Sequence, residues 1–177
     1  MENITIQEKK IIGMVIRTTN ENGKSANDIE LLWQKFWKDE TIHQVEHKIS
    51  NDIYAVYTHY ETDFTGYYDT IIGYEVGVFT AIPEGFVSLV IEGGEFAKFV
   101  STGKMPEAVF NTWLDIWADQ EFNLKRAYKA DFTVHGEKYN DGPEAEVETY
   151  ISVKNWVILF SEDKKLSEVW DPYTEVL

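Results

Sequence analysis

The stretch IELLWQKFWKDE, residues 29–40, places Trp33 and Trp37 four positions apart. Side chains at positions i and i+4 lie on the same face of an α-helix, so this spacing predicts a helix with two indole rings along one side. Both rings are expected to pack in the core rather than to contact a ligand. This helix is the first of two similar elements, and their repetition decides the fold.

The second element is VFNTWLDIWADQ, residues 109–120, in which Trp113 and Trp117 have the same spacing. Similar segments flank the two helices in the same order, with one strand before each helix and two strands after it. In the first half these strands are predicted at 9–18, 52–61 and 67–76, and in the second half at 93–102, 126–135 and 144–153. The run FVSLVI in the link between the halves indicates a further short strand.

A repeat of about 80 residues is too long for a solenoid and indicates a duplicated domain. The chain is therefore predicted to be an α+β protein with duplicated β-α-β-β halves related by a pseudo-twofold axis. Antiparallel sheets would carry two long helices, each covering one face of its sheet. The uncovered faces are expected to meet at a central ligand cleft along the axis.

The composition limits the partners of the chain. Its 177 residues include 16 Lys and Arg against 31 Asp and Glu, for a formal charge of −15. A nucleic-acid-binding protein needs a basic surface to displace counterions, so direct contact with DNA or RNA is not expected, whereas an acidic chain favours cationic partners. No stretch is apolar over the length that a membrane span or a signal peptide requires, which predicts a cytoplasmic protein.

Metal and cofactor sites are not indicated. The chain has no cysteine, and the pair His43 and His47 has only Glu46 nearby, so these residues are interpreted as a surface pair rather than as metal ligands. The sequence contains no P-loop, GxGxxG or nucleophile-elbow motif. No cofactor, metal ion or catalytic residue is therefore assigned.

The order of the motifs resembles the GyrI-like family, which provides effector-binding domains to AraC/XylS-type and MerR-type drug-responsive activators. The motifs are IYAVYTHYE, YYDTIIGYEV, EGFVSLVIEGGEFAKFVSTG, FNTWLDIWAD, AYKADFTVH and VETYISVK. Because no helix-turn-helix is recognised before them, the chain is similar to the stand-alone form of the family, some members of which travel in mobile gene cassettes.

The resemblance assigns residues 1–154 to a GyrI-like effector-binding domain. The remaining residues, 155–177, include the apolar run WVILF. We expect this C-terminal extension to pack on its own domain or on a second subunit. The sequence therefore leaves the choice between a monomer and a homodimer open.

The resemblance also implies a pocket for hydrophobic, often cationic, small molecules. Glu148 in the closing motif is the implied buried counter-charge, with a pKa raised by desolvation in the empty pocket, and Tyr150 shares its face. The strand after the second helix departs from the family pattern, because Thr133 and His135 stand where a Glu and a Tyr are usual. The other ligand-binding candidates, each with core packing as the alternative, are Tyr54, Tyr57, Tyr74, Trp113, Trp117 and Phe132.

The leading functional hypothesis is a stand-alone effector- or drug-binding module without enzymatic activity. A role in transcription would need a separate DNA-binding regulator as partner. Two alternatives stay open. One is a small hydrolase of strained electrophilic compounds that uses Glu148 as general base; the other is a gyrase-inhibitor-like protein whose acidic surface binds a macromolecule.

Overall fold

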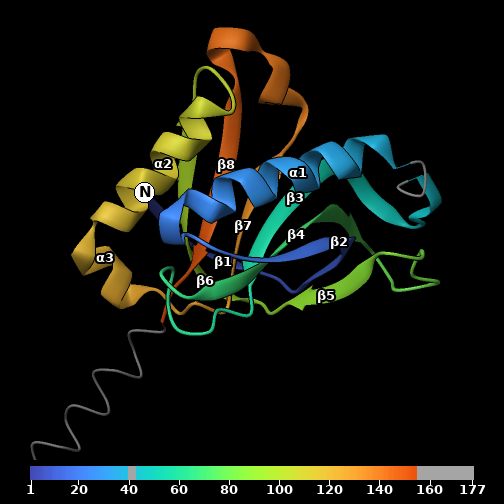
Figure 1. Ribbon diagram of the computed structural model, residues 1–177, viewed down its shortest axis with the longest axis horizontal. Coiled ribbons are helices and arrows are strands. Elements are labelled where there is room, and N and C mark those ends of the chain that lie inside the picture. The colour runs from blue at the N-terminus through green and yellow to red at the C-terminus, as the bar shows by residue number, and fades with distance from the viewer. Residues whose placement is uncertain (40–42, 155–177) are drawn as a thin grey trace, which may run out of the picture.

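A computed structural model describes residues 1–39 and 43–154, and its strands form one continuous antiparallel sheet (Figure 1). Across these residues the strand order is β1-β6-β8-β7-β3-β4-β2-β5. The strands are β1 Glu2–Ile6, β2 Lys9–Thr19, β3 Lys48–Thr58, β4 Tyr67–Val76, β5 Val87–Ile91, β6 Gly94–Thr102, β7 Ala130–His135 and β8 Glu146–Ser152. Every strand expected from the sequence is present, FVSLVI as β5, and β1 is an addition that the sequence analysis did not predict.

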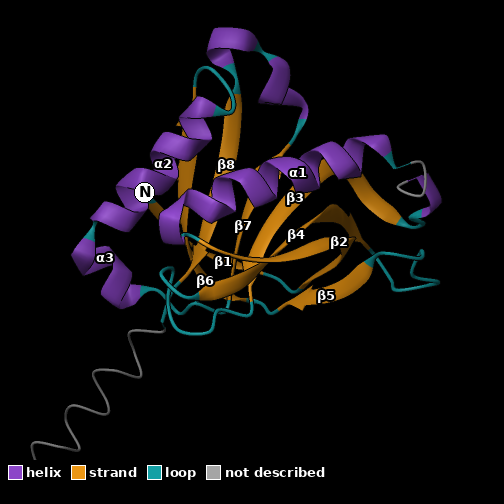
Figure 2. Ribbon diagram, viewed as in Figure 1, coloured by secondary structure: helices purple, strands orange, loops and turns teal. Residues whose placement is uncertain are grey.

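The helices lie together on one side of the sheet, as Figure 2 shows. They are α1 Lys24–Lys38, α2 Glu107–Ala118 and the short α3 Gln120–Lys125. α1 buries Leu32 and Phe36 against the sheet, and α2 buries Ile116. Tyr57 of β3 packs against the hydrophobic clusters beneath both helices, so α1 and α2 share a single face.

The strand order confirms the expected duplication. β3 and β7 form the centre of the sheet, and β4 and β2 on one side match β8 and β6 on the other. Ile53 is paired with His135 and Tyr57 with Asp131, so a twofold rotation through the middle of this strand pair exchanges the halves. The edge strands are swapped, because β1 extends the second half by pairing with β6, and β5 extends the first half by pairing with β2.

The uncovered face of the sheet does not form the cleft that the sequence analysis expected there. The sheet curls, and its edges bring Ile4 of β1 and Ile91 of β5 to the same hydrophobic cluster as Tyr54 and Phe132 of the central strands. Burying these apolar side chains is favourable, and strand alternation directs them all to this face. This face therefore has a core of its own, and the cleft lies on the helix side instead.

The expectation for residues 155–177 concerns a segment outside the described residues. Within residues 1–39 and 43–154, no helix combines the length and the apolar character that crossing a membrane requires.

Candidate functional site

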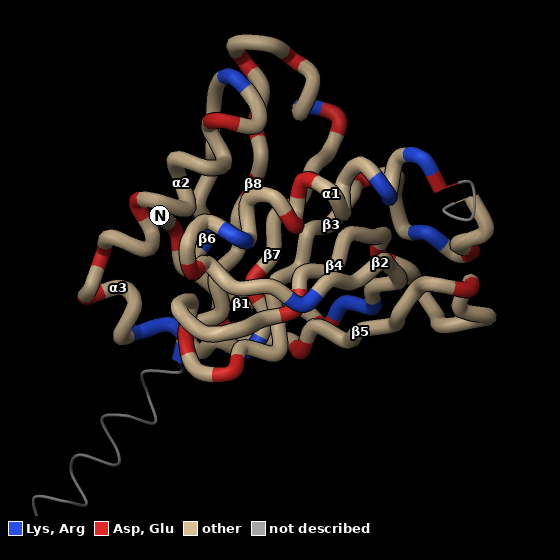
Figure 3. Tube along the Cα trace, viewed as in Figure 1, with Lys and Arg blue, Asp and Glu red and all other residues tan. Residues whose placement is uncertain are grey.

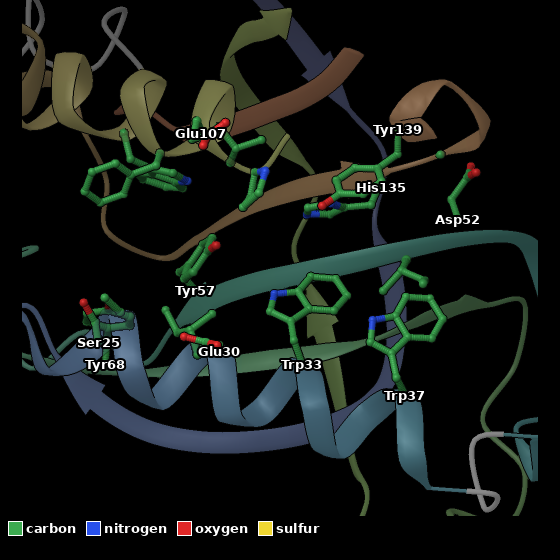
Figure 4. Close-up of a pocket in the computed structure, with 18 of the residues that line it drawn as sticks. Ser25, Glu30, Trp33, Trp37, Asp52, Tyr57, Tyr68, Glu107, His135 and Tyr139 are labelled. Atoms are coloured by element: carbon green, nitrogen blue, oxygen red, sulfur yellow. The ribbon is translucent and has the colours of Figure 1, made fainter. Parts of the chain in front are cut away.

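A cavity of about 1080 Å³ lies between α1 and α2, over the central strands β3 and β7 (Figure 4). Its walls come from both helices, from the ends of β3 and β7, and from the connections that follow these two strands. The second of these connections includes the 3₁₀ helix η3 Glu137–Asn140. Ten aromatic side chains line the cavity: Trp33, Trp37, Tyr57, Tyr60, Phe64, Tyr68, Phe110, Trp113, Trp117 and Tyr139.

α1 contributes Glu30, Trp33 and Trp37, which share one face because they are three and four positions apart. The neighbouring Leu32 and Phe36 are buried against the sheet, which turns both tryptophans toward the cavity. Their rings stack with centroids 6.3 Å apart, and Trp37 is 64% exposed. The expectation of core packing is therefore wrong for Trp37, whereas Trp33 both packs against the core and lines the cavity.

α2 supplies the opposite wall through Phe110, Trp113 and Trp117. Trp113 meets Tyr57 of β3 edge-on, with ring centroids 4.9 Å apart. Trp117 lies parallel to Phe64, with centroids 6.1 Å apart and planes 8° apart. Edge-on and offset-stacked arrangements are the favourable ones for aromatic pairs. The rings of this wall therefore support one another without a ligand.

His135 ends β7 on the floor of the cavity. Its ring lies 5.0 Å from that of Trp33 and 5.3 Å from that of Tyr139, and its Nε2 is 2.9 Å from the Thr133 hydroxyl. Burial disfavours the imidazolium ion and lowers the pKa of His135 to about 4. At neutral pH this ring therefore adds no positive charge to the cavity.

The charge on the cavity wall is negative. Four carboxylates line the cavity, those of Glu30, Asp52, Glu107 and Glu137, and no Lys or Arg is among the described lining residues. Figure 3 shows acidic positions on both helices and on the connection after β7. Lys104, which does not line the cavity, donates to Glu107 at 2.9 Å. Within residues 1–39 and 43–154, no ion pair or hydrogen bond reaches the carboxylates of Asp52 and Glu137, so these charges have no counter-ion in the part of the chain that the structure describes.

Three of the residues expected in the pocket line this cavity: Tyr57, Trp113 and Trp117. The others, which are Glu148, Tyr150, Tyr54, Tyr74 and Phe132, are not among its lining residues. Strand alternation explains most of this result. On β8, Val147 and Thr149 are fully buried on the helix side, so Glu148 and Tyr150 point to the other side. Tyr74 does face the helices, but it is packed in the core beneath α1.

Glu148 lies in a polar cluster on the face opposite the cavity. Its Oε1 is 2.5 Å from Lys98 Nζ, and the Tyr150 hydroxyl donates to its Oε2 at 2.6 Å. Burial favours the neutral acid, but these two hydrogen bonds and the charges of Lys98 and Lys138 together outweigh burial and lower the pKa of Glu148, the reverse of the expected direction. Because Lys98 already neutralises this charge, the placement gives no support to Glu148 as the counter-charge of a ligand.

The first half of the chain repeats this cluster. Tyr54 donates to Glu75 Oε2 at 2.6 Å, and Lys9 Nζ lies 2.9 Å from the same oxygen. The Phe132 ring lies between the two clusters, 5.8 Å from the Tyr54 ring and stacked at 4.7 Å on that of Tyr150. Each cluster thus contains one lysine, one glutamate and one tyrosine, and the glutamate is paired with the lysine and accepts a hydrogen bond from the tyrosine hydroxyl.

Sequence reasoning missed the four cavity carboxylates, both tryptophans of α1, Phe110 of α2, Tyr68 of β4 and three rings from the connections, those of Tyr60, Phe64 and Tyr139. The duplication held a usable signal for α1. If Trp113 and Trp117 face a cleft on the pseudo-twofold axis, their equivalents in the first half must face it as well. No comparable signal exists for the connections, because the tertiary fold alone determines which of their side chains turn inward.

Comparison with known proteins agrees with this architecture. The sequence model of a family described as Cass2, integron-associated effector binding protein, matches residues 4–153. The YobU protein of Bacillus subtilis (strain 168), classed as a candidate transcriptional regulator, is 26% identical over 151 residues, which are 82% of this chain and 92% of YobU. The expected resemblance to an effector-binding domain is therefore confirmed.

Two solved structures share the fold. The integron cassette protein VCH_CASS2, from the mobile metagenome of Vibrio cholerae, superposes with a TM-score of 0.68 at 29% identity, over 86% of this chain and 95% of its own. SAV2435 bound to tetraphenylphosphonium superposes with a TM-score of 0.73 at 14% identity, over 88% of this chain and 94% of its own. At that identity the second likeness concerns the fold alone.

Proposed function

We propose that this chain, which belongs to the family of integron-associated effector-binding proteins, binds lipophilic organic cations in the cavity between α1 and α2. One observation carries the proposal. The described lining residues combine ten aromatic rings and four carboxylates with no lysine or arginine. A cavity of this composition attracts positive charge and apolar surface at once.

The energetics favour a large cation with delocalised or shielded charge. Such an ion is weakly hydrated, so it loses little solvation when it enters the cavity. Each aromatic face then attracts it by about 0.5–2 kcal/mol. A carboxylate in a partly dehydrated site attracts it more strongly than the same carboxylate would in bulk water. Because neither term requires an exact fit, we expect the site to accept several cations of different shape.

The counter-charges that we propose are Glu30, Asp52 and Glu137. All three line the cavity, and neither Asp52 nor Glu137 has an ion-pair partner among the described residues. They replace Glu148, whose carboxylate pairs with Lys98 on the other face of the sheet. Tyr57, Trp113 and Trp117 remain proposed ligand contacts, now joined by Trp33 and Trp37.

The shared fold adds support from SAV2435. That protein has been solved bound to tetraphenylphosphonium, a cation whose charge is enclosed by phenyl rings. The same fold can therefore hold a bulky lipophilic cation. The hydrolase alternative uses Glu148 as general base, and Glu148 is not among the residues that line this cavity, so the cavity gives that alternative no support.

The test compares two ions that have nearly the same shape and opposite charge, tetraphenylphosphonium and tetraphenylborate. Each is titrated into the protein while tryptophan fluorescence is recorded, since four tryptophans line the cavity, and each is added in a thermal unfolding experiment. We expect the phosphonium ion to quench the fluorescence and to raise the Tm, because a ligand that binds only the folded state stabilises it. We expect the borate to bind at least about tenfold more weakly, a difference of about 1.4 kcal/mol.

Equal binding of the two ions would contradict the proposal, since it would mean that the carboxylates do not select the charge. Tighter binding of the borate would contradict it more strongly. Sodium tetrafluoroborate serves as the salt control and is compared with tetraphenylphosphonium chloride at matched ionic strength. The comparison separates the effect of the organic ion from that of added salt.

A further inference from the structure

The two tryptophan-bearing helices make the same contact with opposite halves of the sheet. Trp33 of α1 meets His135 of β7 edge-on, with centroids 5.0 Å and planes 65° apart. Trp113 of α2 meets Tyr57 of β3 edge-on, with centroids 4.9 Å and planes 75° apart. Each contact joins a helix of one half to a central strand of the other half. The cavity therefore contains a pair of pseudo-equivalent contacts, not one continuous aromatic wall.

Strand register supports the equivalence. The pairs Ile53–His135 and Tyr57–Asp131 lie on either side of the centre of the β3–β7 ladder. A twofold rotation at that centre exchanges Tyr57 with His135, and it exchanges the first helix with the second. The two pseudo-equivalent positions thus hold a phenol in the first half and a neutral imidazole in the second.

The ring contacts divide the cavity into two half-sites. Half-site one consists of Trp33, Trp37, His135 and Tyr139, joined in sequence by ring contacts of 5.0–6.3 Å. Half-site two consists of Tyr57, Tyr60, Phe64, Tyr68, Trp113 and Trp117, joined by ring contacts of 4.9–6.2 Å. These ten side chains, which include His135 and leave out Phe110, all line the cavity. Across residues 1–39 and 43–154, no ring contact connects one half-site to the other.

Each half-site has its own carboxylate. Asp52 precedes Ile53, which is paired with His135, and its Oδ1 lies against Gly136. Figure 4 shows Asp52 on the side of His135 and Tyr139, and Glu30 on the side of Tyr57. Glu137 follows Gly136 directly and adds a second acid to half-site one. Negative charge is therefore distributed over both ends of the cavity.

We propose that the cavity is a two-site receptor for dications, that is, molecules in which an apolar linker joins two flat cationic groups. One cationic ring system enters half-site one, the other enters half-site two, and the linker crosses the floor between them. This inference rests on the proposed cation-binding function and names the class of cation that suits the cavity best. A volume of about 1080 Å³ slightly exceeds the usual range for small-molecule sites, about 300–1000 Å³, and leaves space for such a molecule.

Linking the two cationic groups gains affinity without any new type of contact. Once the first group is bound, the second is held near its half-site at a high effective concentration, provided that the linker spans the gap. His135 does not oppose the second cation at neutral pH, since burial keeps its imidazole uncharged. A dication should therefore bind with one-to-one stoichiometry and more tightly than a monocation that carries the same ring.

The test uses isothermal calorimetry with bis-quinolinium ions whose polymethylene linkers differ in length. The reference ligand is an N-alkyl quinolinium whose chain ends in a neutral aromatic ring of similar size, so that it matches the dication in apolar surface. We expect the best dication to bind about tenfold or more tightly than this reference, with an optimum in linker length and one ligand per chain.

Variants at either end sharpen the result. Asp52→Asn combined with Glu137→Gln removes the charge of half-site one, and Glu30→Gln removes that of half-site two. Each change should reduce the ratio of the two affinities toward one, because only the dication uses both ends. Glu144→Gln, an exposed change in the same connection as Glu137, is the control and should leave the ratio unchanged.

The outcomes distinguish this inference from the proposed function. If the reference monocation binds as tightly as every dication, the two-site arrangement is wrong and cation binding stands. If the variants weaken both ligands by the same factor, the cavity is a single site and the inference is equally overturned. If neither quinolinium nor tetraphenylphosphonium binds, both proposals fail together.

Discussion

The two faces of the sheet use the same residue types for opposite purposes. On the curled face, Glu75 and Glu148 each have a lysine and a tyrosine hydroxyl within hydrogen-bonding distance. On the helix face, Asp52 and Glu137 stand beside aromatic rings with no such partner among the described residues. A carboxylate near a tyrosine is therefore not in itself evidence of a ligand site. The presence or absence of an internal cation separates the two roles.

The comparison also explains why the two faces differ in openness. Paired charges and the interleaved rings of Tyr54, Phe132 and Tyr150 allow the sheet to curl over a core on this face. Unpaired charges favour contact with water or with a cation from solution, since burying a lone carboxylate is costly. The helix face consequently keeps an open cavity, and the curled face keeps a core.

The largest effect should come from the buried ion pair beside the cavity. Arg126 and Asp131 are completely buried, with Nη2 and Oδ2 2.6 Å apart, and Tyr60 donates to the same Asp131 oxygen at 2.8 Å. Asp131→Ala leaves the guanidinium buried without a counter-charge and should lower the free energy of unfolding by about 3–5 kcal/mol. Urea denaturation followed by tryptophan fluorescence measures this change.

Two controls show whether burial is the cause. Asp69→Ala removes the ion-pair partner of Arg17, whose side chain is 45% exposed. This change should lower the free energy of unfolding by no more than about 1 kcal/mol. Arg126→Met combined with Asp131→Ala should cost less than Asp131→Ala alone, because no unpaired charge remains. A double variant as unstable as the single one would contradict this explanation.

An intermediate effect is expected from His135 as the pH falls. Burial lowers its pKa from 6.5 to about 4, so the unfolded chain binds the proton before the folded chain does. The stability that the uncharged His135 ring contributes is therefore complete above pH 6.5 and is lost as the pH approaches 4. Relative to His135→Gln, the native protein should lose about 3 kcal/mol of unfolding free energy over this window, measured by urea denaturation at a series of pH values. A constant difference between the two proteins would mean that the imidazole is freely protonated in the folded state.

The smallest effect tests the comparison of the two faces directly. Glu30→Gln combined with Asp52→Asn removes one carboxylate from each half-site and should weaken tetraphenylphosphonium binding about tenfold, or about 1.4 kcal/mol, with little change in stability. Glu75→Gln combined with Glu148→Gln removes the same charge from the curled face. This second variant should keep the affinity and lose at most about 2 kcal/mol of stability, since partly exposed pairs contribute about 1 kcal/mol each or less. Fluorescence titration of both variants measures the affinities, and a larger loss from the curled-face variant would return the counter-charge to Glu148.

The sequence by itself determined the duplicated α+β architecture, because the paired tryptophans and the strand patterns recur in the same order in both halves. The same repeat contained the information that α1 must mirror α2 at the cleft. The acidic composition agrees with the carboxylates that line the cavity, although it did not indicate which acids these would be.

Only the tertiary structure decided which face of each strand meets the helices and which carboxylates are already paired. Alternation along β8 separates Glu148 from Thr149 with certainty, but the side to which each points depends on how the strands join and where the helices pack. Lys98 and Glu148 are far apart in the chain and become partners through the pairing of β6 with β8. The local sequence does not predict such a contact, because the electrostatic environment of a side chain depends on neighbours that only folding brings together.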